Sequence, residues 1–119
     1  MAIVAEVVFD DSKEGDRGIL HGGAIATVLD EAMGAVAYEN GKPGYTVTMT
    51  YNYKSHIPLH APVAIRAWVE KIEGKKVFTA CTATLADGTL AVDGTGLFIA
   101  SEKLKKHLDA KANEIIENE

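Results

Sequence analysis

The chain has 119 residues, of which 12 are Lys or Arg and 17 are Asp or Glu, so its formal net charge is −5 with the histidines neutral. This acidic balance argues against general binding to the phosphate backbone of nucleic acids, which requires clustered basic side chains. The length and an apolar content of 47% predict a single domain over residues 1–119 with a real core. Small domains bury a modest fraction of their surface, so sharing core with a second copy would add stability.

Cysteine content and hydropathy predict where the protein resides. The single cysteine, Cys81, has no partner in the chain, which excludes an internal disulfide framework and a CxxC metal motif. Residues 1–9 carry an acidic side chain in an apolar run and no basic leader, unlike a secretory signal peptide. The longest apolar stretch, 24–38, is interrupted by two carboxylates and is shorter than the ~20 residues that span a bilayer. We therefore expect a soluble, cytoplasmic protein with no membrane partner.

Five stretches rich in β-branched and aromatic residues predict strands. They cover residues 3–9, 45–53, 63–72, 77–86 and 89–100. Glycine-containing turns at 73–75 and 87–88 separate the last three, and short turns make neighbouring strands antiparallel. We therefore expect an antiparallel meander of long strands.

Two further stretches predict helices. Residues 22–38 form an apolar run too long for a typical strand, so we expect a helix that other elements wrap nearly all round, packed on one face of the sheet. The Asn-Gly-Lys-Pro-Gly sequence at 40–44 ends it, because Gly and Asn suit C-cap geometry and Pro cannot continue the helix. Ser101 is a candidate N-cap for a final helix over about 102–118. The apolar stripe of that helix consists of Leu104, Leu108, Ala112 and Ile115. The predicted fold class is therefore α+β.

The start of the central helix carries the first candidate site. Gly22 and Gly23 follow His21, and the N–H groups in the first turn of a helix have no partner within it. Glycines let a ligand approach these donors, so this end can bind an anion or an oxyanion that develops during a reaction. The alternative is structural, since paired glycines also permit a tight turn against the sheet.

A carboxylate in the middle of this helix is the second candidate. Asp30 lies among apolar neighbours, where a charged group is unfavourable unless it is partnered or used in chemistry. Glu31 is rotated from it by about 100° around the helix axis, so the two cannot face one reacting atom equally. Spacing alone leaves open which of them acts, and a carboxylate bonded to a neighbouring strand is the structural alternative.

These residues resemble a known family. The segment HGGAIATxxDEAMG, which begins at His21, is followed by a threonine-rich strand and YxxxxPL, and it is similar to the hotdog-fold acyl-CoA thioesterases of the PaaI-like group. The interval of nine residues from His21 to Asp30 is the most specific element of the resemblance. The resemblance covers the strand, helix and meander in order. It implies a hotdog fold, in which a long antiparallel sheet wraps around one central helix.

The resemblance also implies an enzyme, one that hydrolyses an acyl-CoA thioester to a free acid and coenzyme A. Gly22 would donate its backbone N–H to the thioester carbonyl, and Asp30 would act as nucleophile or as general base for water. Thr46 lies where relatives hold the lytic water or support the carboxylate; its alternative is an ordinary strand threonine. His21 corresponds to a family histidine that bonds the thioester region or braces the glycine turn, and Gly23 is assigned to substrate binding.

The spacing of two candidates predicts an assembly. Gly22 and Asp30 are eight residues apart, which is about 12 Å along one helix. A single carbonyl group cannot meet both from one chain, so we expect the site at a homodimer interface, in two equivalent copies. The resemblance implies the same arrangement, often with dimers paired into tetramers.

No metal ion or redox cofactor is expected, because a thiolate leaves readily and coenzyme A is part of the substrate. His56 and His60 have a spacing that zinc sites use, but the flanking prolines prevent a helix from presenting both on one face. One departure from the family is Gly15, where some relatives carry an amide side chain. Two other functions stay open: a non-catalytic acyl-CoA binder or sensor, and a hotdog dehydratase acting on 3-hydroxyacyl thioesters.

Overall fold

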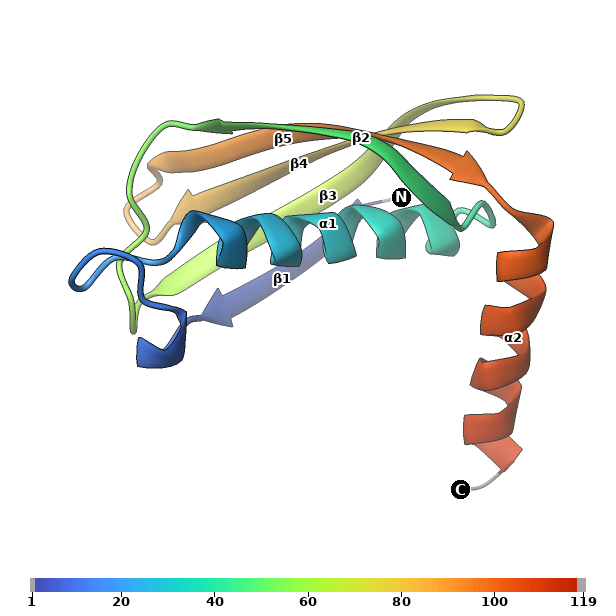
Figure 1. Ribbon diagram of the computed structural model, residues 1–119, viewed down its shortest axis with the longest axis horizontal. Helices are drawn as coiled ribbons and strands as arrows, with labels where there is room; N and C mark the ends of the chain where they lie inside the picture. Colours follow the sequence, from blue (N-terminus) through green and yellow to red (C-terminus); the bar gives the residue numbers. More distant parts are fainter. Residues whose placement is uncertain (1, 118–119) are drawn as a thin grey trace.

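The computed structural model describes residues 2–117, and for 115–117 it describes the backbone alone. Five strands form one antiparallel sheet in the order β1-β3-β4-β5-β2, and helix α1 lies along its concave side (Figure 1). The elements are β1 (Ala2–Val8), a short 3-10 helix η1 (Asp11–Lys13), α1 (Gly22–Glu39), β2 (Gly44–Tyr53), β3 (Pro62–Glu73), β4 (Lys76–Leu85), β5 (Leu90–Ala100) and α2 (Glu102–Glu117). Each predicted strand and helix is present within one residue of its expected bounds, residue 118 lying outside the described part.

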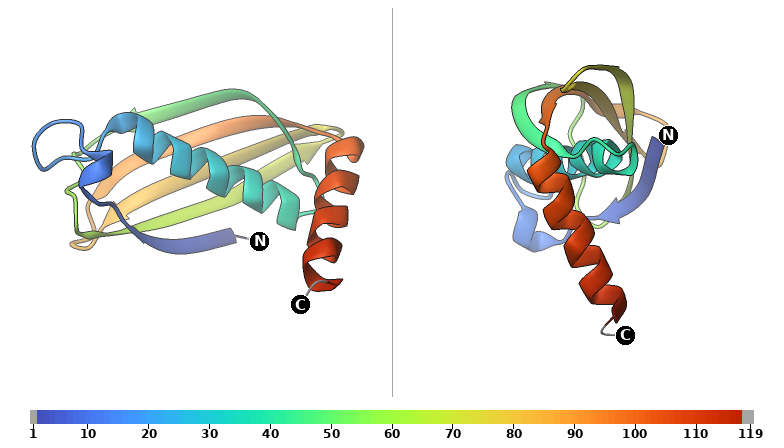
Figure 2. Two further views of the ribbon diagram at one scale, coloured as in Figure 1. Left: turned by 60° about the horizontal axis from the view of Figure 1, so that its bottom comes forward. Right: turned by 90° about the vertical axis from the view of Figure 1, so that its right-hand side faces the viewer.

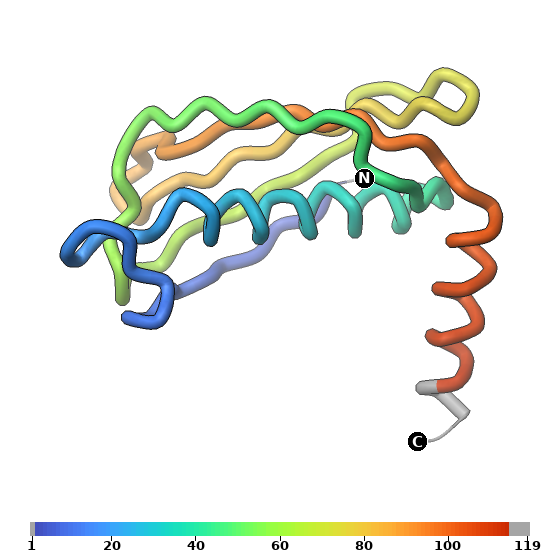
Figure 3. The backbone as a smooth tube through the Cα atoms, in the orientation of Figure 1, coloured from blue at the N-terminus to red at the C-terminus, as the bar shows by residue number. Residues whose placement is uncertain are grey.

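The strand order departs from a simple meander at β2. Strands β3, β4 and β5 follow one another through the two predicted turns, where Gly74 and Gly88 adopt the left-handed backbone conformation, with φ of 60° and 91°. Strand β2 does not lie beside β3, its successor in sequence, but pairs with β5 at the far edge of the sheet (Figure 3). The connecting loop, 54–61, is long enough to cross the end of the sheet, so it imposes no hairpin on β2 and β3.

Apolar or aromatic residues alternate strictly with polar ones over residues 45–53, a pattern that predicts Thr46 and Tyr51 on opposite faces of the strand, but a bulge in β2 makes that prediction wrong. Between β2 and β5, Val47 is an additional residue without a partner in the register. A bulge shifts the residues on one side of it to the opposite face of the strand. Thr46 therefore lies on the same face as Tyr51, toward α1, whereas strict alternation placed the two on opposite faces.

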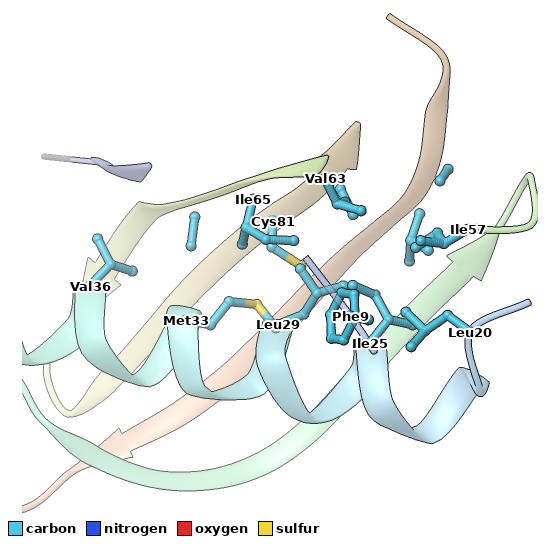
Figure 4. Packing of buried hydrophobic residues seen from close by; sticks show 14 of the residues in the cluster. Phe9, Leu20, Ile25, Leu29, Met33, Val36, Ile57, Val63, Ile65 and Cys81 are labelled. Carbon is cyan, nitrogen blue, oxygen red and sulfur yellow. The ribbon is translucent and has the colours of Figure 1, made fainter. Parts of the chain in front are cut away.

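Helix α1 packs one face against the sheet. Its buried residues are Ile25, Leu29, Met33, Val36 and Ala37. They share a core with inward residues of β3 and β4 such as Ile65 and Cys81 (Figure 4). On the other side of the helix, Gly23, Thr27 and Glu31 are exposed. The expectation of a helix wrapped nearly all round is wrong for a single chain, because the sheet curves around only one side of α1 (Figure 2).

Helix α2 leaves the end of β5 and extends away from the sheet (Figure 2). Ser101 caps it as predicted, with Oγ accepting a hydrogen bond from the N–H of Leu104 at 3.1 Å. The Tyr38 hydroxyl of α1 donates a hydrogen bond of 2.8 Å to the Asp109 carboxylate. This bond raises the pKa of Tyr38 and lowers the pKa of Asp109, because it favours the phenol and the carboxylate.

The apolar stripe predicted for α2 is partly covered. Leu104 and Leu108 are half-buried, Ala112 is exposed, and the side chain of Ile115 lies outside the described residues. Within residues 2–117, no helix combines the length and the apolar character needed to cross a bilayer.

Candidate functional site

His21 is the N-cap of α1. Its backbone is extended, with φ of −65° and ψ of 134°, and its Nδ1 accepts a hydrogen bond of 2.9 Å from the N–H of Gly23. An accepting Nδ1 carries no proton, so the neutral ring holds its proton on Nε2. Within one chain, His21 therefore braces the glycine turn.

The backbone N–H of Gly22 is a donor without an internal acceptor. Gly22 is the first residue of α1, so the helix offers it no acceptor, and none of residues 2–117 supplies another. Gly22 is exposed, and a Cβ placed on it would lie 3.8 Å from the Tyr53 ring, an ordinary contact. A Cβ on Gly23 would lie 3.1 Å from Nδ1 of His21, which is tight. The turn therefore needs a glycine at 23 more than at 22.

Asp30 and Thr46 meet between α1 and β2. Oγ1 of Thr46 lies 3.4 Å from Oδ1 of Asp30, a long hydrogen bond that the threonine donates. The bulge at Val47 makes this contact possible, because it turns Thr46 toward the helix. Asp30 is half-buried, and no basic side chain of the described residues forms an ion pair with it. Glu31 is exposed, so Asp30 is the carboxylate that faces the strand threonine.

Two tyrosines of β2, which we did not single out from the sequence, hold the first turns of α1. The Tyr53 hydroxyl donates to the carbonyl of Gly22 at 3.3 Å, and the Tyr51 hydroxyl donates to the carbonyl of Ala26 at 3.2 Å. Burial, and then the charge of Asp30, raises the pKa of Tyr51 to about 12, so its hydroxyl stays a donor. The signal in the sequence was the pair of tyrosines two residues apart, which places both hydroxyls on one face of the strand.

The candidate residues form two groups in one chain. His21, Gly22 and Gly23 gather at the start of α1, and Asp30 lies with Thr46 further along it. The helix is continuous between them, and its rise separates Gly22 from Asp30 by about 12 Å along the axis. One chain therefore does not bring the glycine donor and the carboxylate to one point.

The two remaining histidines of the sequence analysis differ in their surroundings, since His56 lines a cavity together with Gly22 and His60 pairs with Asp11. Nε2 of His60 pairs with Oδ1 of Asp11 at 2.7 Å, and His56 lines a cavity of about 510 Å³ beside the helix start. In the part of the chain from 2 to 117, no three His, Cys, Asp or Glu side chains gather into a group that could hold a metal ion.

The sequence matches proteins of known family. The family model of the thioesterase superfamily matches residues 17–92. The chain is 45% identical to acyl-coenzyme A thioesterase THEM4 of Xenopus laevis over 87 residues, which are 72% of this chain and 39% of that protein. It is 32% identical to acyl-coenzyme A thioesterase 13 of Pongo abelii over 108 residues, which are 89% of this chain and 72% of that protein. The match thus spans well under half of THEM4.

The fold matches solved structures of the same superfamily. A thioesterase superfamily protein of 30% identity superposes with a TM-score of 0.80, covering 82% of this chain and 48% of that one. Zebrafish thioesterase superfamily member 2, at 27% identity, gives a TM-score of 0.77 over 84% of this chain and 75% of that one. The predicted hotdog fold is therefore confirmed. By its sequence and its fold, this chain belongs to the thioesterase superfamily.

Proposed function

We propose that this chain hydrolyses acyl-CoA thioesters and belongs to the PaaI-like group of hotdog thioesterases. The observation that carries the proposal is the environment of Asp30 on α1. This carboxylate is half-buried, contacts Thr46 of β2 and has no basic partner in residues 2–117. The same helix begins with an N–H, that of Gly22, which has no acceptor within residues 2–117. Two relatives, THEM4 and acyl-coenzyme A thioesterase 13, are named for this activity, which supports the choice of substrate class.

In the proposed reaction, each group has a separate task. The Gly22 N–H donates to the thioester carbonyl oxygen and stabilises the negative charge that develops there. Asp30 either attacks the carbonyl carbon or takes a proton from a water molecule that Thr46 orients. If Asp30 attacks, the C–S bond breaks, coenzyme A leaves as a thiolate, and a water molecule then hydrolyses the anhydride formed between Asp30 and the acyl group. If water attacks, the same C–S cleavage gives the free acid and the thiolate directly. His21 holds the turn that presents the donor by accepting a hydrogen bond from the N–H of Gly23. Gly23 keeps its predicted place in substrate binding, as a glycine that lets the substrate approach the turn. This chemistry requires no metal or redox cofactor.

Two copies of the chain complete the proposed site. Strand β2 is an edge of the sheet, and Tyr45, Val47 and Tyr53 on it are 59%, 53% and 56% exposed. A free strand edge with large apolar side chains is a surface for pairing with another chain. Antiparallel pairing of β2 with its copy would run the two α1 helices in opposite directions. Gly22 of one copy would then approach Asp30 of the other, and such dimers can pair into tetramers.

The test is release of free thiol from short, medium, long and aryl acyl-CoAs. We expect the wild type to cleave at least one of them and Asp30→Asn to lose about 10²–10⁴-fold in rate at matched folding. Glu31→Gln, on the neighbouring exposed carboxylate, is the control and should keep the rate. Binding of acyl-CoA without thiol release would favour a binder or sensor. Loss of water from a 3-hydroxyacyl thioester, without thiol release, would favour a dehydratase.

A further inference from the structure

Helix α2 presents a basic face to solvent. Its half-buried side turns toward α1, where the Asp109 carboxylate accepts a hydrogen bond from Tyr38. Between residues 103 and 111, the exposed side chains include three lysines, Lys103, Lys106 and Lys111, and no carboxylate. None of the three forms an ion pair with a described side chain, although the chain as a whole has a net charge of −5. This basic face is therefore open to an acidic partner.

The segment before α1, residues 10–18, has the opposite charge. It contains four carboxylates and two basic side chains, so its net charge is −2, and all six side chains are exposed. Three of the carboxylates have partners within the chain: Asp10 bonds to Ser12, Asp11 to His60 and Glu14 to the N–H of Gly18. The Asp16 carboxylate has no hydrogen bond or ion pair among the described residues. It is the group of this segment most available to a lysine from outside.

Segment 10–18 also supports the turn that presents the Gly22 donor. The carbonyl of Lys13 accepts a hydrogen bond of 2.8 Å from the N–H of His21. A Cβ on Gly15 would lie only 3.0 Å from Cα of His21, so the segment packs closely on the helix cap. A contact that holds this segment in place therefore also holds the donor turn.

Segment 10–18 and α2 lie at opposite ends of one chain, both on the side of the sheet that carries α1 (Figures 1 and 2). Helix α1, with 18 residues, separates the two ends by about 27 Å, so they do not meet within one chain. Antiparallel pairing of β2 with its copy exchanges the ends and keeps both copies of α1 on one side of the sheet. Helix α2 follows Ala100, which pairs with Gly44 at the start of β2, and Tyr53 at the end of β2 bonds to Gly22. The pairing thus brings α2 of one copy beside segment 10–18 of the other.

We propose that the basic face of α2 docks on segment 10–18 of a second copy and so helps to hold that copy's donor turn. The inference rests on the proposed function, because it uses the dimer paired through β2. Two acidic chains repel each other, and a basic surface placed against an acidic one offsets this repulsion and fixes how the copies are oriented. Helix α2 is then a positioning element for the site of the neighbouring copy.

Charge reversal in two separate variants tests the docking. Lys103→Glu/Lys106→Glu makes the face of α2 acidic, with glutamates that suit the start of a helix, and Asp16→Lys makes segment 10–18 more basic. The two variants are refolded together in equal amounts, one with a mass tag, and the mixed dimer is measured by native mass spectrometry. In a mixed dimer, one contact joins the two reversed surfaces and the other joins the two original ones, whereas both contacts are mismatched in either homodimer. We expect the mixed fraction to rise from the about one half of random pairing to about three quarters at low salt, and to return toward one half in about 1 M salt.

A second mixture controls for net charge. Lys75→Glu/Lys76→Glu changes the net charge by the same amount on the β3–β4 turn, and with Asp16→Lys it should give a mixed fraction of about one half. Hydrogen exchange reports on the donor turn in the same dimers. Amides of residues 10–18 should exchange faster in the Lys103→Glu/Lys106→Glu homodimer than in the wild type or in Lys75→Glu/Lys76→Glu.

Each contrary outcome has a distinct meaning. Equal mixed fractions in the two mixtures, a monomeric wild type, or unchanged exchange over residues 10–18 would overturn the docking. Weaker binding of coenzyme A by Lys103→Glu/Lys106→Glu, with no preference for mixed dimers, would also overturn it and would place the basic face against the phosphates of the substrate. Thiol release by the wild type without any pairing preference would leave the proposed function standing alone. A pairing preference without thiol release from any acyl-CoA would support the docking while the proposed hydrolysis fails.

Discussion

A substitution that removes the Gly22 N–H without disturbing the helix tests whether this group donates to the thioester carbonyl. Proline has no N–H and is favoured at the first position of a helix, which is where Gly22 lies. The residue before a proline prefers extended backbone, and His21 already has φ of −65° and ψ of 134°. A Cβ at position 22 meets the Tyr53 ring at 3.8 Å, so a side chain fits there. Gly22→Pro should therefore fold normally and lose one donor.

The expected effects on activity and on stability have opposite signs. Loss of one donor to a developing oxyanion typically costs about 10²–10³-fold in kcat, or about 2.7–4 kcal/mol. Replacing glycine by proline where the backbone already fits stabilises a protein by about 0.4–1 kcal/mol, because the unfolded chain has less freedom. We therefore expect Gly22→Pro to fall at least about a hundredfold in kcat while its Tm stays equal to or slightly above that of the wild type.

Gly22→Ala supplies the matched control, because it adds a Cβ but keeps the N–H. The assay is steady-state thiol release with the best acyl-CoA, alongside thermal and urea unfolding of all three proteins. We expect Gly22→Ala to keep kcat within about twofold of the wild type, since no donor is lost. Equal losses in Gly22→Ala and Gly22→Pro would show that shape, not the N–H, matters at this position. A folded Gly22→Pro with wild-type kcat would refute the donor role outright.

Three further outcomes test other parts of the site and fold. Thr46→Val removes the hydroxyl that contacts the helix carboxylate and should lower kcat about tenfold, whereas Thr48→Val on the same strand should not; equal effects would contradict a specific role for Thr46. His21→Ala should lower the free energy of unfolding by about 1 kcal/mol and His21→Asn should restore it, because asparagine caps helices well. If His21→Asn is stable but inactive in thiol release, the imidazole also contacts the substrate. The Tyr38–Asp109 hydrogen bond holds α2 most firmly between the ordinary pKa values of the two groups, 3.8 and 10.0. It should weaken as pH falls through the lowered pKa of Asp109 or rises through the raised pKa of Tyr38. The amide chemical shifts of α2 should follow pH accordingly, and an identical titration in Tyr38→Phe would rule out this bond as the cause.

Local sequence patterns were sufficient to predict the elements of the fold. The Asn-Gly-Lys-Pro-Gly segment ends α1 where expected, because its residues suit a C-cap and interrupt the helical backbone. Ser101 caps α2 through its hydroxyl. Gly74 and Gly88 supply the left-handed conformations that the two tight turns need. Each of these features depends on residues close together in the chain, so the sequence carries it directly.

Features that depend on distant parts of the chain were not predictable in the same way. The place of β2 beside β5 follows from pairing across the sheet, and the loop after Tyr53 is too long to specify a neighbour. The bulge at Val47 follows from the register with β5, and nothing in the alternation of β2 indicates it. That bulge turns Thr46 toward Asp30. The family resemblance implied that Thr46 supports the carboxylate or its water, whereas strict alternation along the strand predicted that Thr46 faces away from the helix.

If Gly22 of one copy and Asp30 of another act on the same thioester, two variants that are each inactive alone should restore activity when they are mixed. Gly22→Pro and Asp30→Asn would be unfolded together, refolded as a mixture and assayed for thiol release beside each variant refolded alone. A mixed dimer has one site with both groups intact, so random pairing in equal amounts should recover about a quarter of the wild-type rate. If both groups act from the same chain, every site in the mixture keeps a defect. No recovery in a mixture that contains mixed dimers would contradict the shared site.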